Sequence, residues 1–136
     1  MKNLYFVQAI LSNDNDTVYL PYASACLIAY AKQDKKIAGA YRFHDILFMR
    51  DHPEVALKTI TEPFLVAFSC IIGNTEYSKV LAALVKKTYP DCFIVFGGHG
   101  VTDTVTMMKN HPFIDFLIRG EGEHAFSQLL KTLLTT

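Results

Sequence analysis

Small and hydroxyl-bearing residues follow two apolar segments of this chain, at positions where strands of a parallel sheet would end. The first group comes after 64–68 and consists of Ser69, Cys70, Ile71 and Gly73. The second comes after 92–96 and consists of Gly97, Gly98, His99 and Gly100. Parallel strands present their carboxyl ends at one edge of a sheet, where ligands bind in the crevice. A hydroxyl beside glycines at that edge predicts a site for a bulky ligand.

The glycine run removes all side chains but one from a strand end, which exposes backbone N–H groups and leaves a slot for a flat or bulky group. No Lys-Ser or Lys-Thr pair follows the run, so a P-loop is excluded, and the first apolar segment lacks the dinucleotide-binding glycine fingerprint. The alternative is structural: Ser69 only ends a strand, Gly73 relaxes a loop, and His99 is an exposed loop histidine without metal-binding neighbours.

A third glycine-rich segment follows the apolar stretch 113–118 and consists of Arg119, Gly120, Glu121, Gly122 and Glu123. Glycines on both sides of a carboxylate suit hydrogen bonding to amides or hydroxyls of a ligand, and a carboxylate in a first helical turn suits the helix dipole. We predict that 119–122 lie near the ligand and that Glu123 is structural.

Five apolar segments of strand length alternate with helix-like stretches and must position these residues. The predicted strands are 4–11, 37–43, 64–68, 92–96 and 113–118. Helical crossovers between strands, with no two-residue hairpin turns, indicate parallel pairing with right-handed connections. The prediction is an α/β, flavodoxin-like, three-layer αβα fold with a five-stranded parallel sheet. The strand order 2-1-3-4-5 is taken by analogy with that fold.

The helix signals are clearest between the third and fourth strands. Asn74 or Thr75 can cap a helix there, and lysines at 86 and 87 suit its carboxyl end. Its predicted inner stripe is Val80, Leu81, Leu84 and Val85. Further helices are predicted after Pro21, from Pro53, over 102–109 and over 124–134.

The length and composition predict one compact domain, and the cysteine usage predicts a reducing, cytoplasmic compartment. The 136 residues are 51% hydrophobic and 19% charged, and a chain of this size buries roughly two thirds of its unfolded surface. Thirteen basic residues balance thirteen acidic ones without a basic run, so neither nucleic acid nor a membrane is predicted as a partner. Three cysteines, far apart in apolar segments, predict no disulfide and no zinc or iron–sulfur site.

Two of the residue groups carry a resemblance to a known family. Ser69-x-Ile71, followed after 25 residues by Gly97-Gly98, is similar to the Ser-x-Leu and Gly-Gly elements of cobalamin-binding domains. More closely, the chain resembles the amino-terminal cobalamin-binding domain of radical S-adenosylmethionine (SAM) enzymes. The matching stretches span most of the chain: 20–23, 67–70, 85–90, 96–98 and 119–123.

This resemblance implies that 1–136 is a single cobalamin-binding domain, the N-terminal part of a radical SAM methyltransferase or related enzyme. The parent enzyme would also use SAM and a [4Fe-4S] cluster, but this chain lacks the Cys-x-x-x-Cys-x-x-Cys that holds the cluster. The expected partner is a radical SAM catalytic domain, in cis or in trans, and the chain alone is expected to bind cofactor without catalysis. No catalytic residue or metal ligand is therefore assigned. The predicted cofactor-binding residues are the three groups above, Glu123 excepted, with Ser12, Asn13 and Tyr22.

One departure from the family pattern concerns the lower cobalt ligand. Many cobalamin domains carry Asp-x-His-x-x-Gly after the first strand, whereas 11–18 contains neither histidine nor glycine. The resemblance then implies a base-off, histidine-off mode, in which the nucleotide base leaves cobalt and enters a pocket near Ser69 and Gly97. The lower face of cobalt would be vacant or held by water. This binding mode is a hypothesis.

Two other functions fit the same fold class. A flavin-binding, flavodoxin-like electron-transfer module needs a phosphate loop rich in Ser, Thr and Gly after the first strand, whereas 13–16 is acidic and repels phosphate. A receiver-like interaction domain needs an aspartate after the third strand and a lysine after the fifth, where this chain has Ser69 and Arg119. Cobalamin binding is the favoured interpretation.

Overall fold

A computed structural model describes residues 1–10, 20–71, 73–101 and 103–135 of the chain. Its strands are all parallel, in the order β2-β1-β3-β4-β5, which confirms the predicted flavodoxin-like topology. The strands are β1 (Lys2–Val7), β2 (Tyr41–Phe43), β3 (Leu65–Ser69), β4 (Phe93–Gly97) and β5 (Phe116–Ile118).

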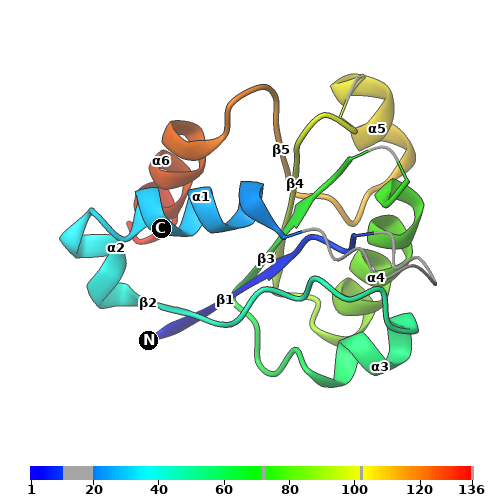
Figure 1. The fold of residues 1–136 in the computed structure, drawn as a ribbon, viewed down its shortest axis with the longest axis horizontal. Helices are drawn as coiled ribbons and strands as arrows, with labels where there is room; N and C mark the ends of the chain where they lie inside the picture. The colour runs from blue at the N-terminus through cyan, green and yellow to red at the C-terminus, as the bar shows by residue number, and fades with distance from the viewer. Residues whose placement is uncertain (11–19, 72, 102, 136) are drawn as a thin grey trace.

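Helices cover both faces of this sheet and give the predicted three layers (Figure 1). One face carries α1 (Tyr22–Ala31), α2 (Lys35–Ala40) and α6 (Glu123–Leu133). The other carries α3 (Pro53–Lys58), α4 (Thr75–Thr88) and α5 (Thr104–Asn110). Because successive strand residues point to opposite faces, the sheet separates two hydrophobic cores.

Strand β3 shows how one segment serves both cores. Val66 and Phe68 belong to the core on the side of α3, α4 and α5, and Leu65 and Ala67 belong to the core on the side of α1, α2 and α6. Every residue of the strand is buried, as its continuous apolar sequence predicts for a strand covered on both faces. The alternation places Ser69, the last residue of the strand, on the α1 and α6 side.

The second predicted strand is wrong over its first half. Residues 37–40 belong to helix α2. Of the predicted strand 37–43, Tyr41–Phe43 pairs with β1. The helix begins there because the Asp34 carboxylate accepts hydrogen bonds from two backbone N–H groups of its first turn. Parallel pairing resumes further along the chain at a single bridge between Val7 and Leu47.

Helix α4 is rotated relative to its predicted inner stripe. Leu81 and Val85 are fully buried as expected, but Val80 is 53% exposed. Two small residues of the helix, Ser78 and Ala82, are fully buried in its place. The last two helices lie within two residues of the predicted bounds. In the described ranges, no helix has the length and hydrophobicity needed to cross a membrane.

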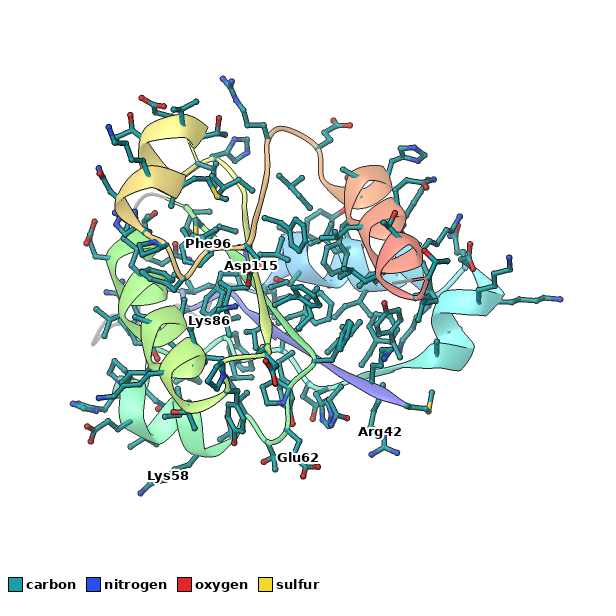
Figure 2. All side chains as sticks on the ribbon, turned by 180° about the vertical axis from the view of Figure 1, so that it is seen from behind. Arg42, Lys58, Glu62, Lys86, Phe96 and Asp115 are labelled. Atoms are coloured by element: carbon teal, nitrogen blue, oxygen red, sulfur yellow. The ribbon has the colours of Figure 1, made fainter. Side chains whose placement is uncertain are left out.

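An ion pair joins α4 to the sheet (Figure 2). Lys86 Nζ lies 2.8 Å from Asp115 Oδ2, and the same carboxylate oxygen accepts a hydrogen bond from the backbone N–H of Ile94 at 2.7 Å. The two charged side chains are only 25% and 27% exposed. Asp115 therefore fixes the segment before β5 against both β4 and the helix layer.

Candidate functional site

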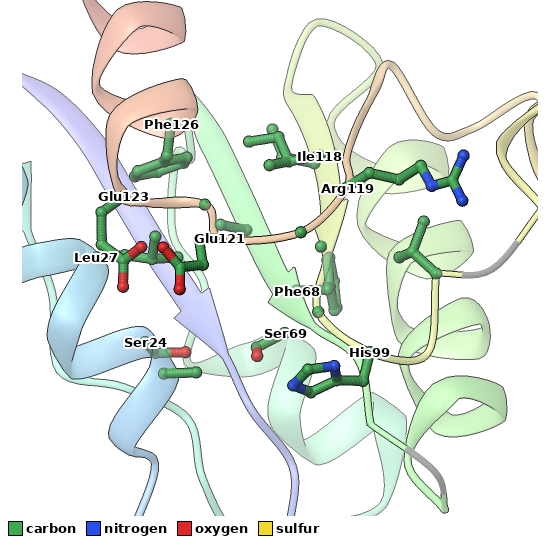
Figure 3. A pocket seen from close by; sticks show the side chains of 18 of the residues that line it. Ser24, Leu27, Phe68, Ser69, His99, Ile118, Arg119, Glu121, Glu123 and Phe126 are labelled. Carbon is green, nitrogen blue, oxygen red and sulfur yellow. The ribbon is translucent and has the colours of Figure 1, made fainter.

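A pocket of about 450 Å³ lies at the carboxyl edge of the sheet, between the ends of β3, β4 and β5 and the helices α1 and α6 (Figure 3). The strand register places Ser69 opposite Gly97, and Gly97 opposite Ile118. All three residues line the pocket. The prediction that the serine and glycine groups meet at one sheet edge is therefore confirmed.

The floor of the pocket is apolar. It is formed by Phe6, Ala67, Val95 and Phe126, from the core on the α1 and α6 side. Gly97 continues this face of the sheet and adds no side chain to it. A Cβ built on Gly97 would meet only Ile118, at 3.5 Å from its carbonyl oxygen and 3.8 Å from its Cβ. The small residues Ala67, Ser69 and Gly97 at the ends of β3 and β4 therefore leave space in the pocket.

Gly98 has a different reason to be glycine. Its φ of +100° is in the left-handed region, and a Cβ there would overlap the carbonyl oxygen of Cys70. Hydrogen bonds hold the two backbones this close: the Cys70 N–H donates to the Gly97 carbonyl at 2.7 Å, and the Gly100 N–H donates to the Cys70 carbonyl at 2.8 Å. The packing of two loops, and not a ligand, requires glycine at 98.

The loop after β3 is organised by Asn74, which occupies the N-cap position of α4 as one of the two predicted residues, but its side chain makes no capping hydrogen bond. Its buried side chain accepts a hydrogen bond from the Ile71 N–H at 2.8 Å and donates one to the Ser69 carbonyl at 3.0 Å. The Ser69 hydroxyl makes no hydrogen bond with the described residues, and Figure 3 shows it at the pocket. It is therefore available to a ligand as donor or acceptor.

Helix α1 forms the opposite wall, with residues other than the predicted Tyr22. Ala23, Ser24 and Leu27 line the pocket, and Ser24 is buried. The side-chain oxygen of Gln8, just after β1, accepts a hydrogen bond from the Ser24 N–H at 3.0 Å. It satisfies a first-turn donor that Pro21, at the cap position, leaves unpaired. The resemblance of 20–23 to cobalamin-binding domains was the available signal for this wall.

Charged and polar side chains surround the opening of the pocket (Figure 3). His99, Arg119 and Glu121 are exposed there, and Glu123 is half-buried. Glu123, predicted to be structural, lines the pocket and also begins α6, where a carboxylate interacts favourably with the helix dipole. The predicted residues of the third group thus all lie at the pocket, together with Glu123.

Four predicted cofactor-binding residues are not in the pocket lining. Cys70 follows Ser69 and joins the core on the other face, because neighbouring strand residues alternate, and burial raises the pKa of its thiol to about 12. Gly73 is exposed in the loop, and Gly100 packs against Cys70 and Thr75. Tyr22 is 77% exposed, so it neither walls the pocket nor packs in the core. Ser12 and Asn13 lie outside the described residues.

The described residues contain no group of three His, Cys, Asp or Glu side chains that could hold a metal ion. The imidazole of His99 lies at the pocket opening. The thiols of Cys70 and Cys92 are buried and form no disulfide. The site is thus an apolar slot with two buried serine residues and a charged rim, an arrangement typical of a small-molecule binding pocket.

Comparison with known proteins agrees with this arrangement. A sequence model of the family described as "B12 binding domain" matches residues 7–130. The chain belongs to this family. The Ser69 and Gly97 elements and the slot between them are therefore parts of a B12-binding domain, and cobalamin is its cofactor.

Several methyltransferases contain a region similar to this B12-binding domain. It is 36% identical over 135 residues to "Cobalamin-dependent radical SAM methyltransferase TokK" of Streptomyces tokunonensis, covering 98% of this chain and 19% of that protein. It is 36% identical over 117 residues to "2-(S-pantetheinyl)-carbapenam-3-carboxylate methyltransferase" of Streptantibioticus cattleyicolor, covering 85% and 17%. It is 32% identical over 98 residues to "Hopanoid C-3 methylase" of Methylococcus capsulatus, covering 66% and 19%. The chain spans less than a fifth of the length of each of these relatives.

Proposed function

We propose that this B12-binding domain holds cobalamin in the base-off form, with the nucleotide base in the pocket beside Ser69 and Gly97. The observation that supports this most is the slot itself: Gly97 lies between Ser69 and Ile118 in adjacent strands and leaves the space between them open. A base that remained on cobalt would make no use of this slot.

The chemistry of the pocket supports the same assignment. Its volume of about 450 Å³ is within the range of roughly 300–1,000 Å³ seen for small-molecule sites. The apolar floor suits a flat aromatic base, and the hydroxyls of Ser24 and Ser69 can hydrogen-bond to ring nitrogens. At the rim, Arg119 suits the phosphate of the nucleotide, and Glu121 suits amides or hydroxyls of the corrinoid.

The lower face of cobalt is proposed to have no histidine ligand. The segment that carries this ligand in many cobalamin domains has no histidine in this chain, and His99 comes from a different strand end. The visible absorption spectrum of the loaded protein should therefore be the same for the wild type and His99→Ala. An imidazole-ligated spectrum that is lost in His99→Ala would contradict the proposal.

The chain is further proposed to be the N-terminal cofactor module of a radical SAM methyltransferase. The support is that its relatives are methyltransferases in which a similar region covers less than a fifth of the protein. When bound, cobalamin supplies the cobalt centre that methyl transfer uses, and SAM and a [4Fe-4S] cluster would be held by a radical SAM domain. The residues of this chain bind and orient the cofactor and exclude water from its base.

Titration with hydroxocobalamin, followed by visible absorption, tests the binding site. Gly97→Leu fills the slot and should weaken binding about 10- to 100-fold, the range that overpacking of a filled site produces. Gly39→Leu is the matched control, because Gly39 lies in α2 away from the pocket with nothing within 4 Å of its Cβ position. Far-ultraviolet circular dichroism checks that both variants fold. A folded Gly97→Leu variant that binds like wild type would sink the assignment.

A further inference from the structure

The loop that follows β3 forms part of the pocket beyond the end of that strand. Ile71 of this loop lines the pocket, and its N–H donates a hydrogen bond to Asn74 Oδ1 at 2.8 Å. The Ile71 carbonyl accepts a hydrogen bond from the Thr75 hydroxyl at 3.0 Å. Ser69 is held by the ladder of the sheet, whereas Ile71 lies outside the strand and takes its position from the loop. Whatever holds the loop therefore holds this part of the pocket.

A second segment, 47–51, lies on the other side of β1 from this loop. The Leu47 N–H donates to the Phe6 carbonyl at 2.8 Å, and the Leu47 carbonyl accepts from the Gln8 N–H at 3.0 Å. Val7 is paired with Leu47 on one side and with Phe68 of β3 on the other. A contact between the segment 47–51 and the loop after β3 must therefore cross the end of β1.

Arg50 makes this contact. Its guanidinium donates a hydrogen bond to the Gly73 carbonyl, and its Cζ lies 5.6 Å from the centroid of the Tyr77 ring in α4. The Tyr77 hydroxyl in turn donates to the Asp51 carbonyl at 2.6 Å. Arg50 Nε is buried and has no hydrogen-bond partner among the described residues, so the guanidinium lies partly inside the contact between the two segments. A charge-assisted hydrogen bond and a cation over an aromatic ring both favour this arrangement.

We infer that Arg50 is a positioning residue for cobalamin binding, which fixes the loop after β3 from across β1 and so holds Ile71 at the pocket. The inference rests on the proposed function, because it takes the pocket as the place where cobalamin binds. Gly73, which accepts the bond from Arg50, directly precedes Asn74, whose side chain bonds to Ile71. Without Arg50, the loop would keep its bonds on the β4 side, at Cys70, and lose its bond at Gly73 on the β1 side.

Titration of the wild type and Arg50→Met with hydroxocobalamin, followed by visible absorption, tests this role. Methionine keeps much of the side-chain length and removes the donors and the charge, so binding should weaken about three- to tenfold, within the range for residues that act on a site through others. Arg42→Met is the matched control and should bind like the wild type, because Arg42 is an exposed residue of β2 (Figure 2). Unchanged affinity in a folded Arg50→Met variant would overturn the inference and leave the proposed function intact.

The conservative variant Arg50→Lys shows which property of the side chain matters. Lysine keeps a positively charged donor for the Gly73 carbonyl but has no planar group to lie over the Tyr77 ring. It should therefore recover part of the affinity that Arg50→Met loses. Binding by Arg50→Lys that is weaker than binding by Arg50→Met would contradict a role based on this hydrogen bond.

Amide hydrogen exchange in the cofactor-free protein separates positioning from general stability. In Arg50→Met, the Ile71 N–H should exchange faster, because its bond to Asn74 lies in the released loop. The amides inside β3 should keep their wild-type protection, because the ladder on both sides of the strand is unchanged. Equal acceleration of the loop and strand amides would indicate a general loss of stability and overturn the positioning role, and so would an unchanged rate at Ile71.

A double-mutant cycle tests whether Arg50 acts through Ile71. Ile71→Ala should itself weaken cobalamin binding, and adding Arg50→Met should then have a smaller effect than in the wild-type background. Fully additive effects would overturn the inference. If Arg50→Met does not fold, Tyr77→Phe removes the bond to Asp51 and should shift affinity and Ile71 exchange in the same direction by less. If the wild type bound no cobalamin, the proposed function would fail and the inference with it.

Discussion

The two faces of the sheet are built from alternate residues of the same strands, but they end differently at the carboxyl edge. On the side of α3, α4 and α5, the last positions carry Phe68 and Phe96, whose ring centroids are 5.1 Å apart. On the side of α1 and α6, the adjacent positions are Ala67 and Gly97, and the pocket lies above them. A shift of one residue along a strand changes a filled core into a binding slot.

Because the two faces alternate along each strand, residues that stabilise the fold and residues that line the pocket are neighbours in the sequence. Large aromatic side chains fill the closed face, which carries α3, α4 and α5, near this edge, and small residues at the adjacent positions on the other face leave room for a ligand. Substitutions at neighbouring positions should therefore have different effects. Four experiments test this contrast.

The largest effect is expected on the closed face, at Phe96. Its side chain is fully buried and contacts the rings of Phe68 and Phe113. Phe96→Ala should lower the free energy of unfolding by about 3–5 kcal/mol, because it removes apolar contacts and leaves a cavity. Urea denaturation followed by circular dichroism measures the change. A loss below about 1 kcal/mol would mean that this face is not tightly packed.

The next effect separates the two adjacent glycines. Gly98→Ala should lower the free energy of unfolding by about 1–3 kcal/mol from its backbone conformation alone, and by more because its Cβ overlaps Cys70. Gly97→Ala should change it by no more than about 0.5 kcal/mol, because its Cβ has only ordinary contacts. Thermal or urea unfolding of both variants tests this, and equal losses would remove the distinction.

A smaller effect is expected at Gln8, whose side chain holds the first turn of α1 at the wall of the pocket. Gln8→Ala leaves the buried N–H of Ser24 without its acceptor and should lower the free energy of unfolding by about 1–2 kcal/mol. Cobalamin affinity should fall too, since Ser24 lines the pocket. Gln33→Ala, an exposed glutamine just after α1, is the control and should change neither quantity. Unchanged stability and affinity in Gln8→Ala would show that the wall does not depend on this bond.

The smallest effect concerns the buried thiols of the closed face. Burial raises the pKa of Cys70 and of Cys92 from 9.0 to about 12. Their protonated forms stabilise the fold below pH 9, and this contribution is lost as the pH rises from 9 towards 12, because the unfolded thiols ionise first. The urea midpoint should therefore fall over this range, and less so in Cys70→Ala.

At pH 8, a thiol reagent should modify the half-buried Cys26 long before the buried Cys70 and Cys92. Rapid modification of all three would contradict their burial.

Residue patterns predicted the sheet and one wall of the pocket because these depend on short-range rules. The apolar run of β3 fixes a strand covered on both faces, and parallel pairing then brings Ser69 and Gly97 to one edge. Strand alternation, applied one step further, would also have separated Cys70 from Ser69. Asp34 is a cap signal that would have identified α2 in place of the first half of the second strand.

The other wall depends on tertiary structure that a sequence pattern does not contain. The sequence predicts a helix after Pro21, but not that Ser24 and Leu27 of this helix lie beside the slot. In α4, the stripe of large residues misplaced Val80, because the buried side of the helix includes the small residues Ser78 and Ala82. Close approach between elements favours small residues, which hydrophobic periodicity does not detect.

The bond between Gln8 and Ser24 makes the two sides of the opening mechanically unequal. It joins the first turn of α1 to the end of β1, which pairs with a strand on each of its sides. On the opposite side, Gly120 and Glu121 make no hydrogen bond to the described part of the chain, and Gly120 has a φ of +74° with nothing within 4 Å of its Cβ position. Within the described residues, the connection between β5 and α6 is thus not tied to the sheet at these two positions, in contrast to the first turn of α1.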